Sequence, residues 1–152
     1  MSVPPSARSL VVRDATPEDA PALAALLAEL GYPTPPDVVA ARLAALVGAG
    51  DRALVAVDGS EALGLLTVHV TPVLHRPTAV GRLTALVVAE RARGRGVGRA
   101  LVAAGERALA ARGCALIEVT SNRRRTDAHA FYERLGYTGT SLRFAKTLAP
   151  EG

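Results

Sequence analysis

Residues 86–101 join an apolar run to a turn rich in glycine and arginine, followed by a helical pattern. Glycines let the backbone approach an anion closely, and arginines pair with phosphate oxygens. The first turn of a helix adds free amide N–H groups and the positive end of the helix dipole. The residues with this chemistry are Arg93, Gly94, Arg95, Gly96, Gly98 and Arg99. The stretch therefore predicts a cradle for a pyrophosphate.

Two common nucleotide motifs do not fit this turn. The dinucleotide fingerprint needs glycines spaced Gly-x-Gly-x-x-Gly, and its third glycine would fall on Arg99. The phosphate-binding loop of nucleotide hydrolases needs Gly-Lys-Ser or Gly-Lys-Thr, which the chain lacks. The plain alternative is a glycine-rich turn that only caps a helix. The interleaved arginines favour the anion site over that alternative.

Hydrophobic periods and turn residues indicate the elements that must position the cradle. The pattern predicts a strand, two helices, a hairpin, then strand, helix, strand, helix and strand, at about residues 10–13, 17–30, 36–47, 53–57, 63–70, 80–88, 97–112, 115–120, 127–135 and 141–148. Asp58-Gly59 marks the hairpin, because it is a favoured tight-turn dipeptide. This order predicts a mixed α/β fold around a central sheet. We expect one domain over residues 1–152, with residues 1–8 disordered.

Arg93, Gly96 and Gly98, placed between an apolar strand and a helix, resemble the acetyl-coenzyme A motif of the GNAT N-acetyltransferase superfamily. Residues 127–137 resemble the later motif of that superfamily, and one helix and one strand separate the two. The resemblance covers nearly the whole chain. It implies a mostly antiparallel sheet flanked by about four helices, an N-acetyltransferase activity, and acetyl-coenzyme A as cosubstrate.

The resemblance also implies which residues contact the coenzyme. The strand backbone at Leu86, Val87 and Val88 would bind the pantetheine arm like an added strand. The backbone amides of residues 93–99, with Val97 among them, would hold the pyrophosphate. Further contacts are expected at the later motif, from Asn122, Asp127, Ala128 and Phe131. The usual asparagine of that motif is replaced, because Arg125 stands in its place and Asn122 lies three residues earlier.

Tyr132 matches the tyrosine that protonates the departing coenzyme A thiolate in this family. A phenol with an ordinary pKa of about 10 is protonated at neutral pH and can supply that proton. The alternative is an aromatic side chain that packs in the core beside Phe131. We favour the catalytic role.

The attacking amine must lose a proton, and many family members carry a glutamate for this on the strand before the first motif. Thr84 and Ala85 stand there in this chain. Glu118 is our first candidate for the base or for a substrate ligand, and His69 and His75 follow it. The structural alternatives are that Glu118 is a charge at the rim of the site and that each histidine is a strand or loop residue with satisfied hydrogen bonds.

A finer similarity concerns the acceptor. His69, His75 and residues 127–132 and 142–146 look similar to aminoalkylphosphonate N-acetyltransferases. Arg143 could then meet a phosphonate. The chain also resembles aminoglycoside acetyltransferases, but few acids stand where a polycationic substrate would bind. We therefore expect a small primary amine, with an anionic group as an option.

Two other classes of function remain open at this point. The chain could bind acyl-coenzyme A without catalysis, which the missing glutamate favours and Tyr132 opposes. It could also be a nucleic-acid module, since it has a net charge of +4 and three consecutive arginines at 123–125. The chain has no tryptophan and no matching nucleic-acid motif, so we expect no nucleic-acid partner.

Composition sets the remaining expectations. Hydrophobic residues make up 49% and charged residues 21%, which is ordinary for a globular protein. The single cysteine, Cys114, excludes an internal disulfide and suits a reducing compartment. No apolar run approaches membrane-spanning length. We expect a cytoplasmic protein without membrane contact or bound metal, and the resemblance adds a homodimer as an option.

Overall fold

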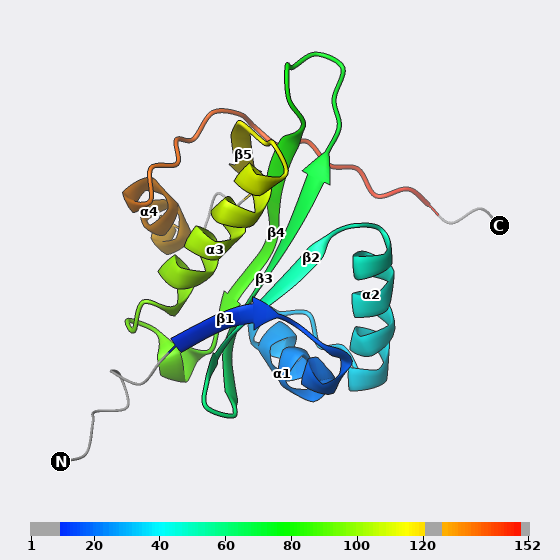
Figure 1. Ribbon diagram of the computed structural model, residues 1–152, viewed down its shortest axis with the longest axis vertical. Helices are drawn as coiled ribbons and strands as arrows, with labels where there is room; N and C mark the ends of the chain where they lie inside the picture. The colour runs from blue at the N-terminus through cyan, green and yellow to red at the C-terminus, as the bar shows by residue number, and fades with distance from the viewer. Residues whose placement is uncertain (1–9, 121–125, 150–152) are drawn as a thin grey trace. The chain divides into compact units, whose positions relative to one another are not determined.

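The computed structural model describes residues 10–120 and 126–149, and the chain divides into two compact units, Met1–Val119 and Thr120–Gly152 (Figure 1). The first unit holds the sheet and three α-helices, and the second holds α4 (Thr126–Arg134). The disorder expected for residues 1–8 concerns positions outside the described residues.

The sheet orders its strands β1-β2-β3-β4-β5, as they occur along the chain. Their bounds are Leu10–Asp14, Arg52–Asp58, Glu61–Thr71, Val80–Val88 and Leu116–Val119. The first three pairings are antiparallel, and β4 pairs with β5 in parallel. The predicted hairpin and the mostly antiparallel sheet are thereby confirmed.

One face of the sheet packs against α3 (Val97–Ala111) through positions that have no side chain. A Cβ atom built at Gly64 of β3 would lie 2.8 Å from the side chain of Leu101 of α3. A Cβ atom built at Gly81 of β4 would lie 2.9 Å from the side chain of Leu109 of α3. A Cβ on Gly105 of α3 would lie 2.6 Å from Leu66 of β3. The helix therefore lies unusually close to β3 and β4, and its first turn is fixed relative to both strands.

Two helices follow β1, namely α1 (Ala20–Leu30) and α2 (Pro36–Gly48), and they contact β2, β3 and β4. Leu65, which alternates with the α3-facing positions of β3, is also buried. Both faces of the sheet are therefore covered, with α1 and α2 opposite α3. Short 3-10 helices precede α1 (η2, Pro17–Asp19) and α3 (η3, Glu90–Ala92).

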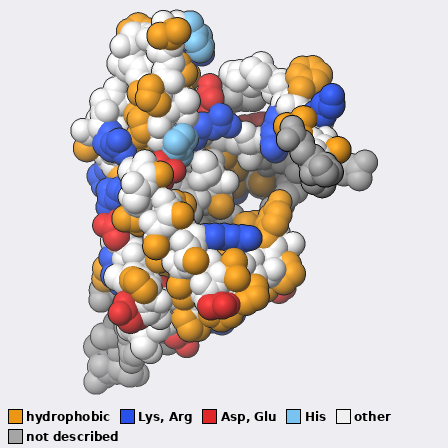
Figure 2. Space-filling model, turned by 90° about the vertical axis from the view of Figure 1, so that its right-hand side faces the viewer, with side chains coloured by type: hydrophobic (Ala, Val, Ile, Leu, Met, Phe, Trp, Pro, Cys, Tyr) orange, Lys and Arg blue, Asp and Glu red, His pale blue; other side chains and the backbone are white. Residues whose placement is uncertain are grey.

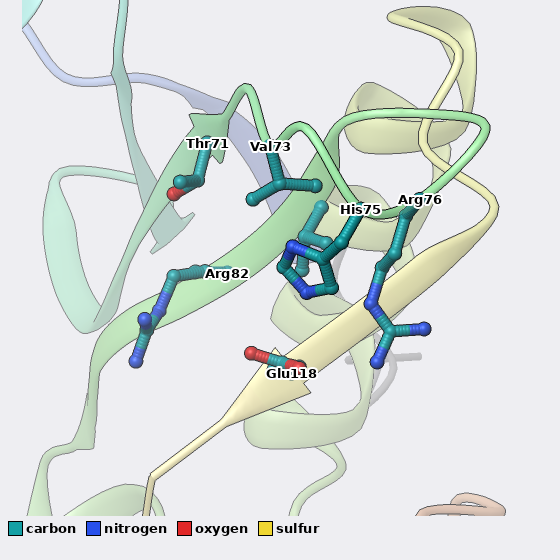
Figure 3. Close-up of a pocket in the computed structure, with 7 residues that line it drawn as sticks. Thr71, Val73, His75, Arg76, Arg82 and Glu118 are labelled. Atoms are coloured by element: carbon teal, nitrogen blue, oxygen red, sulfur yellow. The ribbon is translucent and has the colours of Figure 1, made fainter.

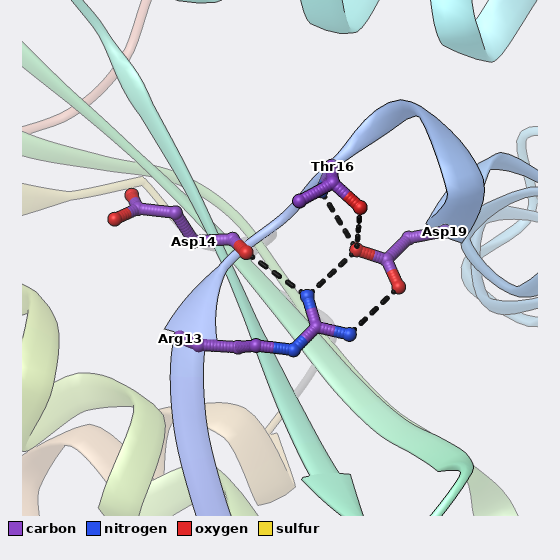
Figure 4. Close-up of polar contacts among 4 residues, drawn as sticks. All are labelled: Arg13, Asp14, Thr16 and Asp19. Carbon is purple, nitrogen blue, oxygen red and sulfur yellow. Dashed lines mark hydrogen bonds and ion pairs between the residues drawn. The ribbon is translucent and has the colours of Figure 1, made fainter.

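A salt bridge fixes the turn from β1 into α1 (Figure 4). Arg13 donates from Nη1 and Nη2 to the two carboxylate oxygens of Asp19, at 2.8 and 2.9 Å. Asp19 Oδ2 also accepts the backbone N–H of Thr16 at 2.7 Å. The entry of α1 is thus tied to the edge strand of the sheet.

The prediction of a strand at residues 141–148 is wrong. The described structure assigns no regular element there, and Leu142, Phe144 and Leu148 are exposed. A strand needs a neighbour to satisfy its backbone groups, and none pairs with this segment among the described residues. The alternating pattern of these residues was therefore insufficient evidence for a strand.

Candidate active site

The glycine- and arginine-rich loop takes a conformation that only glycine adopts readily. Gly94 and Gly96 both have φ of +79°, in the left-handed region, and Gly96 is the N-cap of α3. A Cβ at either position would meet nothing within 4 Å, so the space beside the backbone is open. Gly96 has no side chain that could cap α3, so its first amides stay available to an anion. These observations fit a pyrophosphate site.

Contacts from neighbouring elements hold this loop in place. Glu29, near the end of α1, accepts the backbone N–H of Glu90 at 2.9 Å, at the start of η3. Arg91 donates to the carbonyl oxygen of Ala62 at 3.3 Å, and Ala92 is fully buried. Arg95, expected to meet phosphate, donates instead to Asp58 at 3.2 Å in this structure. Phosphate binding by Arg95 stays a prediction.

In the described part of the chain, the strand before the loop is only partly paired on the β5 side. The pairing of β4 with β5 ends at Leu83 opposite Val119, while β4 continues to Val88. The register between β3 and β4 shifts at the same level, between Thr67 and Val68. Thr84 lies at this irregularity and donates its hydroxyl to the carbonyl oxygen of Thr67. Within the described residues, residues 84–88 thus have no paired strand on the β5 side, as the binding of an extended ligand along this edge requires.

A shallow cavity of about 160 Å³ lies at the other end of β4. Its lining comes from the end of β3, the connection to β4, β4 itself and β5: Thr71, Val73, His75, Arg76, Val80, Arg82 and Glu118. Figure 3 shows His75 and Arg76 reaching from the connection toward Glu118, with Arg82 nearby. Two predicted residues, His75 and Glu118, are therefore brought together. The sequence did not predict a role for the two arginines, because strand register places Arg82 in the lining and Arg76 comes from the irregular connection between β3 and β4.

His69 lies outside this lining but borders it. It is opposite Arg82 in the β3–β4 register, and Thr71 follows it on the same face of β3. Its Nδ1 lies 2.6 Å from Oδ1 of Asp51. Nothing local in the sequence predicts this contact of Asp51.

The second unit holds the remaining candidates. The ring of Tyr132 on α4 contacts the rings of Phe131 and Tyr137 edge to face, with centroids 5.2 and 5.7 Å away. The backbone N–H of Tyr137 bonds to the carbonyl oxygen of Tyr132, which closes the end of α4. Asp127 lies in the first turn of this helix, next to Ala128. Arg143 lies in the irregular segment after it.

Some predicted features lie outside what the structure describes. Asn122 and the arginines at 123–125 are among the residues not described. In the described part of the chain, no group of three or more His, Cys, Asp or Glu residues is placed to hold a metal ion. Within the same part, no helix is long and apolar enough to cross a membrane.

Figure 2 shows that basic side chains on one face lie at separate points rather than in one patch. Histidine and acidic side chains lie among them in the upper half of that view. A continuous basic stripe, which is typical of nucleic-acid binding, is absent from the described residues on that face.

Comparisons with known proteins agree with one another. The sequence model of the acetyltransferase (GNAT) family matches residues 20–137. An aminoalkylphosphonate N-acetyltransferase from Salmonella typhimurium is 33% identical over 142 residues, which are 90% of each chain. A putative acetyltransferase from Agrobacterium tumefaciens has a TM-score of 0.81 at 26% identity, over 91% of this chain and 99% of that one. An aminoglycoside N-acetyltransferase solved with coenzyme A has a TM-score of 0.84 at 19% identity, over 97% and 100%.

Proposed function

Because this chain belongs to the acetyltransferase (GNAT) family, we propose that it transfers the acetyl group of acetyl-coenzyme A to a small primary amine. Family membership confirms the resemblance drawn from the two motifs, and it makes the protein an N-acetyltransferase. The observation that supports the proposal most directly is the open, uncapped start of α3 beside the unpaired edge of β4.

The coenzyme site that we propose uses backbone rather than side chains. Amides of residues 94–98 bind the pyrophosphate, since the left-handed glycines leave room for it. The backbone of Leu86, Val87 and Val88 binds the pantetheine amides as a neighbouring strand would. Acetyl-coenzyme A supplies a thioester whose carbonyl carbon is open to attack by a neutral amine. Asp127, Ala128 and Phe131 complete the proposed set from the second unit.

The cavity favours an acceptor that carries a negative group. Arg76 and Arg82 together offer two guanidinium groups, which bind carboxylate, phosphate or phosphonate oxygens well. Glu118, on the same lining, can bind the ammonium end of such a molecule. The Salmonella relative is named for aminoalkylphosphonates, which combine these two groups. An aminoglycoside fits less well, because it is polycationic and this cavity contains two arginines.

The first experiment measures coenzyme binding. Isothermal calorimetry with acetyl-coenzyme A should show one site per chain, and Gly96→Asp should weaken it at least tenfold, by about 1.4 kcal/mol. The substitution puts a carboxylate where the pyrophosphate would bind. Gly113→Asp is the matched control, because Gly113 also has a positive φ, of +86°, and a Cβ there would meet nothing, but it follows the opposite end of α3. Absence of binding in the wild type would refute the proposed function.

The second experiment tests the proton donor. Tyr132→Phe removes one hydroxyl while keeping the ring that contacts Phe131 and Tyr137. We expect binding of acetyl-coenzyme A to persist and kcat for an aminoalkylphosphonate to fall about a hundredfold, as for the loss of a general acid. Tyr137→Phe is the matched control, because it removes a hydroxyl from a neighbouring ring that contacts Tyr132. Unchanged turnover in Tyr132→Phe would contradict the role of Tyr132 without affecting the coenzyme site.

A further inference from the structure

A row of charged and ionisable side chains crosses the sheet beside the cavity. His69 on β3 lies opposite Arg82 on β4, and Arg82 lies opposite Glu118 on β5. Asp51, just before β2, contacts His69 from the other side. Residues directly opposite each other on neighbouring strands point to the same face. Each of β3, β4 and β5, and the residue just before β2, therefore contributes one side chain to a single row on that face of the sheet.

The contact between Asp51 and His69 orients the imidazole ring. Oδ1 of Asp51 lies 2.6 Å from Nδ1 of His69, and an ionised carboxylate can only accept a hydrogen bond. The shared proton therefore lies on Nδ1. In the neutral ring, Nε2 then keeps a lone pair that can take a proton. The His69 side chain is 41% exposed and the Asp51 side chain 21%, so the ring is accessible while the carboxylate is more protected.

Asp51 is held firmly by the end of α2. Its backbone N–H donates to the carbonyl oxygen of Leu46 at 3.0 Å. The backbone N–H of Gly50 donates to the carbonyl oxygen of Val47. Arg112, which follows α3, donates to the carbonyl oxygen of Gly50 at 2.7 Å. These bonds fix the backbone that leads into Asp51, so His69 meets a carboxylate on an anchored turn.

Chemistry distinguishes His69 from the other groups of the row. An imidazole is ordinarily a stronger base than a carboxylate, with reference pKa values of about 6.5 and about 4.3. An arginine does not accept protons near neutral pH. Neither Thr84 nor Ala85, which stand where a glutamate was expected from the resemblance, carries a basic side chain, and Thr84 donates its hydroxyl to the carbonyl oxygen of Thr67. His69 is thus the group at this level best suited to remove a proton.

We propose that His69, oriented by Asp51, accepts the proton that the acceptor amine loses; this assignment rests on the proposed function. The amine nitrogen bonds to the acetyl carbonyl carbon as the carbon–sulfur bond breaks. The amine proton passes to Nε2 of His69, directly or through one water, and the thiolate takes the proton of Tyr132. Asp51 is a positioning residue that holds the ring in the tautomer with Nε2 unprotonated. Arg82 and Glu118 remain ligands of the substrate's charged ends.

The kinetic test compares His69→Gln with Glu61→Gln, an amide substitution of an exposed acid at the β2–β3 turn. His69→Gln should lower kcat at neutral pH about a hundredfold and leave acetyl-coenzyme A binding intact. The deficit should shrink about tenfold per pH unit as the free amine becomes abundant, because the variant depends on amine that solvent has already deprotonated. The ionisable groups near His69 are Asp51, which contacts it, and Arg82, which lies opposite it; His75, Arg76 and Glu118 line the adjoining cavity.

Other outcomes overturn the assignment. A deficit that stays constant with pH would indicate a structural role, and a change confined to KM would make His69 a substrate ligand. A pH-dependent loss in Glu118→Gln, but not in His69→Gln, would move the base to Glu118. If the wild type binds acetyl-coenzyme A but acetylates no amine, the proposed function fails and the assignment falls with it. Full turnover in His69→Gln would refute the role of His69 as the base and leave the proposed function intact.

A second measurement does not depend on activity. Nitrogen-15 NMR of histidine-labelled protein reads the tautomer of each ring, and His69→Gln identifies the signal of His69. We expect protonated Nδ1 and unprotonated Nε2 in the neutral ring, and a shift toward the other tautomer in Asp51→Asn. A neutral ring with its proton on Nε2 would refute the proposal, because such a ring offers no acceptor on that side.

Discussion

Arginines bond to carboxylates at the ends of strands in the described part of this basic chain. Arg13 bonds to Asp19 and Arg52 to Asp14 with two hydrogen bonds each, and Arg95 bonds to Asp58 with one. The bidentate pairs fix β1 to η2 and to β2, so these arginines serve the fold. The number of arginines in the sequence therefore overstates the number available to an anionic ligand. Arg95 is the pair member that lies in the proposed coenzyme loop, and it has the longest contact.

The Arg13–Asp19 pair makes stability depend on pH. The hydrogen bond from Arg13 lowers the pKa of Asp19 to about 2, against the opposing effect of burial. A carboxyl group whose folded pKa is lowered stabilises the protein above its unfolded pKa of about 3.8 and loses this effect as pH falls toward 2. Arg13 is 42% exposed, so solvent screening reduces the contribution to about 1 kcal/mol.

Asp19→Asn should therefore lower the free energy of unfolding by about 1 kcal/mol at pH 7, measured by urea titration. The difference from the wild type should shrink as pH falls from about 4 and vanish below pH 2, because both proteins then carry an uncharged group at this position. Glu61→Gln, which changes an exposed acid of the β2–β3 hairpin, should show little difference at either pH. A difference that is as large at pH 2 as at pH 7 would mean that Asp19 contributes to stability through packing and not through its charge.

The sequence predicted some residues of the site better than others, for physical reasons. The glycines at 94 and 96 were predictable, since a turn that must approach an anion needs them. Glu118 and His75 were expected as alternatives for one role, and they line one cavity. Asp51 and Arg82 acquired their importance only from the strand register, which depends on contacts distant in sequence. The pairing of Arg95 with Asp58 is of the same kind.

At the level of elements, the close approach of α3 to the sheet sets the position of the coenzyme loop. Gly64 and Gly81 on the strands and Gly105 on the helix remove the side chains that would separate the two layers. In the sequence, such glycines look only like weak points of a strand or a helix. Element types and their order were predictable from periodicity, whereas this packing distance was not. The strand expected at 141–148 failed because pairing, not pattern, makes a strand.

Gly105→Ala should reveal this packing. Alanine normally stabilises a helix by about 1 kcal/mol relative to glycine, but its Cβ would lie 2.6 Å from the fully buried Leu66. Overpacking costs about 1–3 kcal/mol, so we expect a net loss of stability and weaker binding of acetyl-coenzyme A as α3 shifts. Thermal unfolding and calorimetry measure the two effects.

Gly48→Ala is the matched control for this substitution. Gly48 is the last residue of α2, and a Cβ there would meet nothing within 4 Å. Its replacement should leave binding unchanged and stability equal or higher. If Gly105→Ala proved as harmless as Gly48→Ala, the close contact of α3 with β3 would not be essential.

At the scale of the whole chain, apolar burial is unevenly distributed. The buried hydrophobic residues of the described structure run from Ala20 to Cys114, all in the first unit. No residue from 127 to 149 is buried, so the second unit has little core of its own. Local stability follows buried apolar contacts, and the second unit should therefore open more readily. Yet it carries Tyr132, which we propose as the proton donor.

Coenzyme binding should therefore couple the stability of the two units, and Tyr32→Phe makes this measurable. The chain has three tyrosines and no tryptophan, so this variant leaves only Tyr132 and Tyr137 as fluorophores, both in the second unit. Circular dichroism meanwhile reports mainly the sheet and helices of the first unit.

Without ligand, the fluorescence transition should occur at lower urea concentration than the dichroism transition. Acetyl-coenzyme A at a hundred times its Kd should stabilise both, by up to about 2.7 kcal/mol. At the same ligand concentration, Gly96→Asp should reduce both shifts by about 1.4 kcal/mol or more, in line with its weaker binding. A fluorescence transition that stays fixed while the dichroism transition moves would exclude the second unit, and with it Tyr132, from the coenzyme site.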